Sequence, residues 1–335
     1  MEERKIMRNK ILISLIIVIL VLTANYGIKI VSPKSNNQKT EKVTVLLDWF
    51  PNTNHTGLYV AKDKKYFQEN KIEIKIIQPS EGENIQLVAS LKADFAVSSQ
   101  EAVTLARAKD IPVVSIAAII QHNTSAFASL KKSNIEKVAD FEGKRYGGWG
   151  SPIEEATLKA LMENASADYS KIKNITIGTT DFFTSIGRDS DFQWIFYGWD
   201  GIEAERRGIK LNLIMLKDLL PVLDYYTPVI ITSENHLNNK KNTVKKFMTA
   251  VVKGYEFAVD NPQEASEILI KNVPEINADL VRRSQKWLSS QYQAEASQWG
   301  IQKSQVWQRY ADWLFEKTLI EKNINADKAF TNKFL

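Results

Sequence analysis

The chain of 335 residues contains no cysteine and only three histidines. Without cysteine there is no disulfide framework, thiolate zinc site, iron–sulfur cluster, cysteine nucleophile or cysteine-linked lipid. A strong excess of one charge sign is also lacking, because 44 Lys and Arg face 39 Asp and Glu, for a net charge of +5. The lack of cysteine thus excludes functions that depend on a thiolate, and the position of the small basic excess becomes the first question.

The basic excess lies in the first 40 residues. This segment contains seven basic and two acidic residues, which leaves 37 of each sign in residues 41–335. A neutral remainder does not favour nucleic-acid binding. The length predicts two globular units, with ordinary soluble composition at 44% hydrophobic and 25% charged residues.

An apolar run, residues 11–24, follows the basic residues Arg4 to Lys10 and is typical of an export signal. As a helix, residues 11–28 span about 27 Å, slightly less than a bilayer core of about 30 Å. Leu22 occupies the first position of a small-x-small cleavage site, which favours a retained anchor over a cleaved signal peptide and a secreted product. Residues 33–39 form a polar tether, and the remainder is expected on the extracytoplasmic face.

Strand and helix patterns alternate along the rest of the chain and predict an α/β protein. Strands are expected at 43–47, 72–77, 95–97, 113–120, 144–147, 172–177, 192–197, 211–216 and 228–232. Helices are expected at 57–69, 83–92, 100–108 and 153–164, with a helix-and-turn stretch at 134–142 and a helical tail after about 240. The tail is expected to pack on the first α/β unit.

This order predicts two lobes joined by two crossings of the chain, near 125–135 and near 220–228. The first lobe is discontinuous and comprises 41–130 plus 228–335; the second comprises 131–227. Ligands of such open sheets bind at the carboxyl ends of the strands, between the lobes.

Five segments combine aromatic, amide and acidic residues near strand ends. They are 48–57 (DWFPNTNHTG), 98–101 (SSQE), 121–124 (QHNT), 147–155 (GGWGSPIEE) and 194–203 (WIFYGWDGIE), the last joined by 224–226 (DYY). Tryptophan rings could stack on a flat heterocycle while carboxylates accept hydrogen bonds from it. The alternative is structural: turn formers, helix caps and core aromatics. Exposed amides at the glycine-rich turn could hold an anion, but no Walker A or dinucleotide motif is present.

The segments 48–61, 144–156 and 194–203 resemble the solute-binding components of ABC importers for thiamin precursors, and the resemblance covers 42–335. It implies a periplasmic-binding-protein type II fold with a double-crossover hinge. It also implies a monomer that binds a thiamin pyrimidine precursor, formylaminopyrimidine or hydroxymethylpyrimidine, and presents it to a permease and ATPase. No cofactor, metal or catalytic residue is expected.

Carried over to this chain, the resemblance suggests stacking by Trp49, Trp149 and either Tyr197 or Trp199, and pairing of Glu203 with the aminopyrimidine. Lesser polar contacts are Asn52, Asn54, Ser98 and Tyr226. The candidate set is completed by His55, Tyr59, Gly150 and Ser151. Ser99 stands where the family pattern has an aromatic residue, and no lipid-anchoring cysteine is present.

Three alternatives remain open at this point. The chain could bind another small solute, such as a sulfonate, nitrate or a thiamin analogue. It could be a sensor ectodomain of the same fold. It could also act like the fungal thiamin-pyrimidine synthases, which share the fold but carry a cysteine-rich iron-binding segment that this chain lacks.

Overall fold

A computed structural model of the chain describes residues 7, 39–79, 83–178 and 180–335. Residues 1–39 and 40–335 form separate units, and the account below concerns the second. The predicted anchor, 11–28, lies outside the described residues. Within the described part of the chain, no helix has the length and apolar character needed to cross a membrane.

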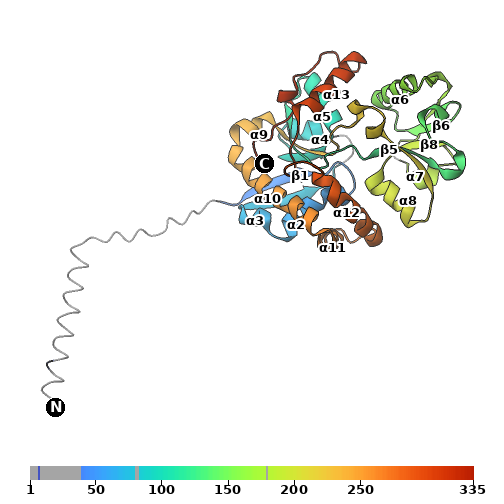
Figure 1. The fold of residues 1–335 in the computed structure, drawn as a ribbon. Coiled ribbons are helices and arrows are strands. Elements are labelled where there is room, and N and C mark those ends of the chain that lie inside the picture. Colours follow the sequence, from blue (N-terminus) through green and yellow to red (C-terminus); the bar gives the residue numbers. More distant parts are fainter. Residues whose placement is uncertain (1–6, 8–38, 80–82, 179) are drawn as a thin grey trace. The chain divides into compact units, whose positions relative to one another are not determined.

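Residues 40–335 contain two five-stranded sheets with helices packed against them (Figure 1). The first sheet has the order β2-β1-β3-β10-β4, and the second has the order β7-β6-β8-β5-β9. The strands are β1 (Glu41–Leu46), β2 (Ile72–Ile77), β3 (Phe95–Ser98), β4 (Val113–Ala118), β5 (Ser125–Leu130), β6 (Arg145–Gly148), β7 (Lys173–Thr176), β8 (Phe192–Phe196), β9 (Leu211–Met215) and β10 (Val229–Ser233).

The helices lie between these strands and in the C-terminal third of the chain. The α-helices are α2 (Thr56–Asp63), α3 (Tyr66–Glu69), α4 (Asn84–Ala89), α5 (Gln100–Ala108), α6 (Pro152–Asn164), α7 (Phe182–Ser185), α8 (Ile202–Arg206), α9 (Glu234–Asn239), α10 (Lys241–Asp260), α11 (Pro262–Asn272), α12 (Ala278–Gln293) and α13 (Ser304–Glu316). Shorter turns are η1 (Thr53–His55), η2 (Lys131–Ser133), η3 (Val138–Phe141), η4 (Tyr169–Lys171), η5 (Tyr197–Gly201), η6 (Leu216–Asp218), η7 (Pro221–Leu223) and η8 (Ala326–Lys328).

Most predicted elements are present within a few residues of their expected bounds. The single helix expected at 57–69 is two helices, because Lys65 adopts a left-handed conformation with φ of 64°. The turn redirects the chain so that Phe67 enters the core, where it is 1% exposed.

The two sheets share one design. In each, three strands run parallel (β2, β1 and β3; β7, β6 and β8) and the next strand, β10 or β5, is antiparallel to both of its neighbours. These antiparallel strands are the ones that the chain enters after passing from the other sheet. Strand β5 was not predicted. The boundary between the two lobes was predicted at residue 130, whereas Ser125–Leu130 already pairs within the second sheet.

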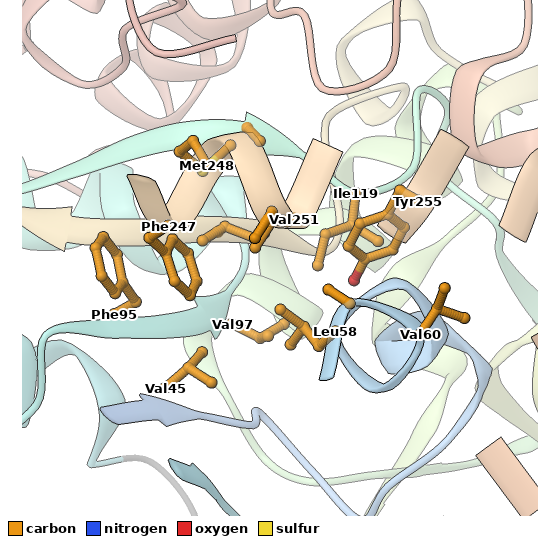
Figure 2. Close-up of a cluster of buried hydrophobic side chains, with 14 of the residues drawn as sticks. Val45, Leu58, Val60, Phe95, Val97, Ile119, Phe247, Met248, Val251 and Tyr255 are labelled. Carbon is orange, nitrogen blue, oxygen red and sulfur yellow. The ribbon is translucent and has the colours of Figure 1, made fainter. Parts of the chain in front are cut away.

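The first sheet is covered on both faces, and all six residues of β4 are buried as a result. One face packs against α2 and α10, where the rings of Phe95 and Phe247 stack with centroids 3.7 Å apart (Figure 2). The helices α2 and α10 approach closely at two glycines, since a Cβ on Gly254 would lie 2.1 Å from the Gly57 carbonyl oxygen. Helix α10 of the C-terminal third therefore packs on the first sheet.

The opposite face of the first sheet packs against α5 and α13. This second cluster includes Trp307, Tyr310 and Tyr225, and it extends to Ile153 and Ala160 of α6, which belong to the second lobe. The second sheet has its own core around Phe127, where the rings of Phe141 and Phe192 stack at 4.1 Å. Each lobe thus has an independent core, and α6 also packs against the first lobe.

Candidate functional site

The loop after β1 carries the first predicted segment, and its shape is fixed from within. Asn52 caps η1 by accepting a hydrogen bond from the Asn54 amide at 2.8 Å. His55 is fully buried; its Nδ1 accepts the Asn52 amide at 3.2 Å, and its Nε2 lies 2.7 Å from an Asp48 carboxylate oxygen. Because Nδ1 is an acceptor, Nε2 carries the ring hydrogen and donates a hydrogen bond to the Asp48 carboxylate. Asn52 and His55 therefore support the loop.

Beside the more exposed Phe50, Trp49 is also open to solvent on this loop. It is 39% exposed, and its ring meets that of Phe50 edge-on at 5.7 Å. An exposed tryptophan on a loop held by buried hydrogen bonds provides a rigid flat surface. Tyr59, in contrast, is 7% exposed and packs against Leu269, Val273 and Val281. Burial is the main cause that raises the pKa of Tyr59 to about 12.

The glycine-rich loop after β6 is fixed by one buried carboxylate. Glu154, 2% exposed, accepts hydrogen bonds from the Tyr146 hydroxyl at 2.6 Å, the Trp149 amide at 3.2 Å and the Ser151 amide at 2.9 Å. The Ser151 hydroxyl, as the N-cap of α6, accepts a hydrogen bond from the Glu154 amide at 3.2 Å. Gly150 has φ of +86°, a conformation that side chains rarely adopt.

The carboxylate of Glu154 accepts hydrogen bonds from two loop amides that were predicted to be free to bind an anion. The start of α6 is therefore already neutralised by the chain's own negative charge. Trp149 projects from the loop, 44% exposed, with its ring edge-on to Trp194 at 5.5 Å. In this segment, too, a tryptophan is exposed, and Glu154 and Ser151 hold the loop that carries it.

The segment 194–203 turns from β8 into α8 through η5, and its polar residues are engaged. The Glu203 carboxylate accepts hydrogen bonds from Arg206 at 2.6 and 2.8 Å and from Arg207 at 2.5 Å. The Arg206 hydrogen bonds are the largest of the interactions that hold the pKa of Glu203 below its usual value. Tyr197 donates to Glu205 at 2.5 Å. A ligand that donates a hydrogen bond to Glu203, as predicted, would therefore compete with the guanidinium groups of Arg206 and Arg207.

Helix α12 of the first lobe contacts this segment directly. The Ser284 hydroxyl donates to the Gly198 carbonyl and lies 2.6 Å from the Thr53 hydroxyl of the first loop. The rings of Tyr197 and Trp287 meet at 4.9 Å. Trp199 packs against the cluster that contains Tyr59. Residues of the first and fifth segments are therefore brought together, through a helix that sequence reasoning did not connect with the site.

Ser98 and Tyr226 lie at the ends of strands in the first sheet. Ser98 is 8% exposed and is paired with Val229 of β10. Tyr226 is 2% exposed, and its hydroxyl accepts the Lys303 amide at 3.0 Å. Its backbone amide donates to the Gln100 side chain at 2.9 Å. Both predicted residues are therefore buried, and the Tyr226 hydroxyl already has a hydrogen-bond partner.

Three acidic or phenolic groups near the lobe junction were not in the predicted set. Burial, followed by the charge of Glu154, raises the pKa of Glu101 to about 7, and Tyr225 acts in the opposite direction through a hydrogen bond. Burial raises the pKa of Asp200 to about 6. The segment around Glu101 was noticed for its polar residues, but nothing in the sequence could show that Glu154 of the other lobe faces it.

The charges at these strand ends are mainly negative. Arg145 at the start of β6 donates to both Asp191 oxygens and is thereby neutralised. In the described part of the chain, no group of three or more His, Asp or Glu side chains is placed to hold a metal ion. Two surface hollows, one beside α9 and one beside α13, are not lined by any predicted site residue.

Two lobes with mixed sheets, two crossings and loops gathered at the strand ends define the fold of the periplasmic binding proteins. The alkanesulfonate-binding protein SsuA from Xanthomonas axonopodis pv. citri, solved with MOPS bound, has this fold. It matches with a TM-score of 0.66 at 13% identity, over 88% of this chain and 99% of that chain. At this identity the likeness establishes the fold alone.

The chain belongs to the NMT1/THI5-like family, whose profile matches residues 52–265. The formylaminopyrimidine-binding protein of Halalkalibacterium halodurans is 30% identical over 333 residues, covering 97% of this chain and 99% of the relative. A 4-amino-5-hydroxymethyl-2-methylpyrimidine phosphate synthase from Legionella pneumophila is 24% identical over 305 residues, covering 88% of this chain and 92% of the relative. Relatives of this chain thus include a binding protein and an enzyme.

Proposed function

We propose that this protein is the extracytoplasmic solute-binding component of an ABC importer and that its ligand is a pyrimidine precursor of thiamin. Formylaminopyrimidine and hydroxymethylpyrimidine are the two candidate ligands. The observation that carries the proposal is the end-to-end likeness to a formylaminopyrimidine-binding protein, over 97% of this chain and 99% of the relative. The N-terminal segment would hold the protein at the outer face of the membrane, where a permease and ATPase take over the ligand.

The chemistry of the strand ends supports a ligand that is flat and rich in hydrogen-bond donors. Trp49 and Trp149 expose ring faces from the two lobes, and heteroaromatic rings stack on such faces. Glu101 and Asp200 add two carboxyl groups near the strand ends, and burial raises their pKa values to about 7 and about 6. An aminopyrimidine has both features, since its ring is aromatic and its exocyclic amine donates hydrogen bonds.

An anionic solute such as a sulfonate fits these groups less well. The start of α6 is filled by Glu154, and Arg145, Arg206 and Arg207 are bonded to acidic side chains. A synthase role is also disfavoured, because the chain has no cysteine to supply thiolate ligands for iron. We therefore propose binding without catalysis, by a monomer that closes around its ligand.

Isothermal titration of the full-length chain tests the ligand assignment. The expected result is one-to-one binding of formylaminopyrimidine or hydroxymethylpyrimidine, and weaker or no binding of methanesulfonate and nitrate. Preferential binding of either anion would replace the pyrimidine assignment by the anion-binding alternative. No heat from any pyrimidine would remove the assignment altogether.

A further inference from the structure

Three consecutive residues of the second lobe pack against helices of the first lobe. The rings of Tyr197 and Trp287 of α12 meet edge-on with centroids 4.9 Å apart. The Gly198 carbonyl accepts a hydrogen bond from the Ser284 hydroxyl. Trp199 packs on the apolar cluster formed by α2, α11 and α12. None of these first-lobe groups belongs to a crossing of the chain, so the contact joins the lobes independently of their covalent connections.

Ser284 is the polar centre of this contact. It is fully buried, and its one hydroxyl hydrogen is directed to the Gly198 carbonyl. The Thr53 hydroxyl, 2.6 Å away, must therefore donate to Ser284. The Thr53 carbonyl in turn accepts the Tyr292 hydroxyl of the same helix at 2.5 Å. A continuous chain of hydrogen bonds thus runs from the loop that carries Trp49, through α12, to the second lobe.

Helix α12 also reaches one of the crossings, where the Gln121 amide donates to the Gln291 carbonyl at 3.2 Å. Ser284 lies two helical turns earlier, about 10 Å away along the axis. Rotation of the lobes about the crossings would keep this end of α12 in place and separate Ser284 from Gly198. The two surfaces fit closely, since a Cβ on Gly198 would lie 3.1 Å from Cδ2 of Leu288.

We propose that residues 197–199 and α12 form the contact that holds the lobes closed around the ligand, with Ser284 as its positioning residue. The inference rests on the proposed function and extends it, because it gives Tyr197 and Trp199 a role in closure in place of stacking on the ligand. Since α12 also holds Thr53, closure and the shape of the Trp49 loop depend on one helix. A ligand that orders this loop therefore favours the closed state.

The contact acts on affinity through the population of the closed state. Without the Ser284 hydroxyl, the Gly198 carbonyl has no donor when it is buried, whereas water supplies one when the lobes are apart. The closed state alone is therefore destabilised, and the apparent Kd of every ligand rises by the same factor. A residue that touches the ligand behaves differently, because its loss changes the affinities of two ligands to different extents.

Calorimetric titration of the full-length chain with formylaminopyrimidine and with hydroxymethylpyrimidine tests the proposal. Ser284→Ala is expected to weaken both ligands about tenfold and to leave the ratio of their Kd values unchanged. The matched control is Ser266→Ala. Ser266 is also buried, at 1% exposed, but its hydroxyl donates to the Gln263 carbonyl within α11 at 2.6 Å. The control should keep both affinities.

Two further measurements remain informative if Ser284→Ala folds poorly. Trp287 is partly exposed, and Trp287→Ala should weaken both ligands by one common factor of about five. The second measurement uses the lack of cysteine, because two introduced cysteines are then the only thiols. Fluorescent labels on Lys286→Cys of α12 and Lys210→Cys of the second lobe should come closer together when formylaminopyrimidine is added. Unchanged energy transfer at saturating ligand would contradict closure at this contact.

The outcomes separate this inference from the function on which it rests. If the wild-type chain binds a pyrimidine and Ser284→Ala and Trp287→Ala bind it equally well, the closure contact is wrong and the pyrimidine assignment survives. Unequal weakening of the two ligands would place residues 197–199 on the ligand and likewise contradict the inference. If the wild-type chain binds neither pyrimidine, the proposed function fails, and this inference fails with it.

Discussion

The two loops that expose tryptophan are built at equivalent places in the two sheets. Trp49 follows β1 and Trp149 follows β6, and each of these strands is the middle one of three parallel strands. Both loops are fixed by a buried side chain that binds loop amides, His55 in the first lobe and Glu154 in the second. The difference lies in the supporting group. An imidazole that is bonded to the Asp48 carboxylate supports the first loop, whereas the Glu154 carboxylate binds the amides of the second loop directly.

This difference shows how similar scaffolds can present similar rings with different electrostatics behind them. Glu154 adds negative charge to the lobe junction and raises the pKa of Glu101, although burial is the larger cause. His55 lies against the Asp48 carboxylate, so the first loop also contains an acidic group. The charge of Glu154 on the second lobe nevertheless reaches Glu101 of the first lobe.

Loss of the Glu154 side chain should have the largest effect on stability. Glu154→Ala leaves the Tyr146 hydroxyl and two loop amides without their acceptor, so the free energy of unfolding should fall by about 3–5 kcal/mol. Urea denaturation followed by circular dichroism measures this loss. Glu155→Ala is the neighbouring control, because it removes only an exposed ion pair with Lys159 and should cost less than about 0.5 kcal/mol. Equal losses for both variants would show that Glu154 does not support the loop.

His55 should matter less, since it serves one amide and one carboxylate. His55→Leu is expected to lower the free energy of unfolding by about 2 kcal/mol and to weaken pyrimidine binding, because the Trp49 loop loses its shape. The matched control is His236→Leu. His236 is also buried and lies 2.8 Å from Asp94, but it is outside both loops. The control should lose stability and keep its affinity; a loss of affinity in both would mean that the effect is not local.

The exposed rings should affect binding without affecting folding. Trp49→Ala and Trp149→Ala are each expected to weaken pyrimidine binding by about 1 kcal/mol, roughly fivefold in Kd. Because both side chains are more than a third exposed, the free energy of unfolding should change by less than about 0.5 kcal/mol. Phe315→Ala, at another exposed aromatic residue, should change neither quantity. Retained affinity in both tryptophan variants would exclude stacking between the loops.

The smallest effect is expected at the crossings, where His122 bonds to Asp224 at 2.7 Å and to Glu295 at 2.9 Å. The Asp224 hydrogen bond is the largest of the causes that raise the pKa of His122 from 6.5 to about 9. A raised pKa means that this stabilisation is complete below pH 6.5 and disappears as the pH rises through 9. Partial exposure limits it to less than about 1 kcal/mol. His122→Gln should therefore flatten the fall in stability between pH 6 and pH 10, and an unchanged fall would assign it to other groups.

The fold was largely accessible from the sequence, because β-branched runs and helical periods mark nearly all of its elements. The exceptions are instructive. Ser125–Leu130 was missed as a strand because small residues and Ser dilute its apolar pattern, and only its pairing with β8 and β9 identifies it. The antiparallel direction of β10 also depends on partners that are distant in the sequence.

The site was less accessible, because the sequence does not show which of its conspicuous residues are exposed and which hold the loops. Trp49 and Trp149 are exposed, whereas Asn52, His55 and Ser151 hold the loops, and the ligand contacts of all five stay predictions. Tyr59 and Tyr226 are buried in the first lobe.

We expect the two tryptophan loops to hold one pyrimidine between the lobes. Calorimetric titration of the full-length Trp49→Ala, Trp149→Ala double variant with formylaminopyrimidine, beside the wild-type chain, tests it most directly. The account predicts one-to-one binding by the wild-type chain and a loss of about 2 kcal/mol, roughly thirtyfold in Kd, in the double variant. Wild-type affinity in a folded double variant, or no binding by the wild-type chain, would contradict it.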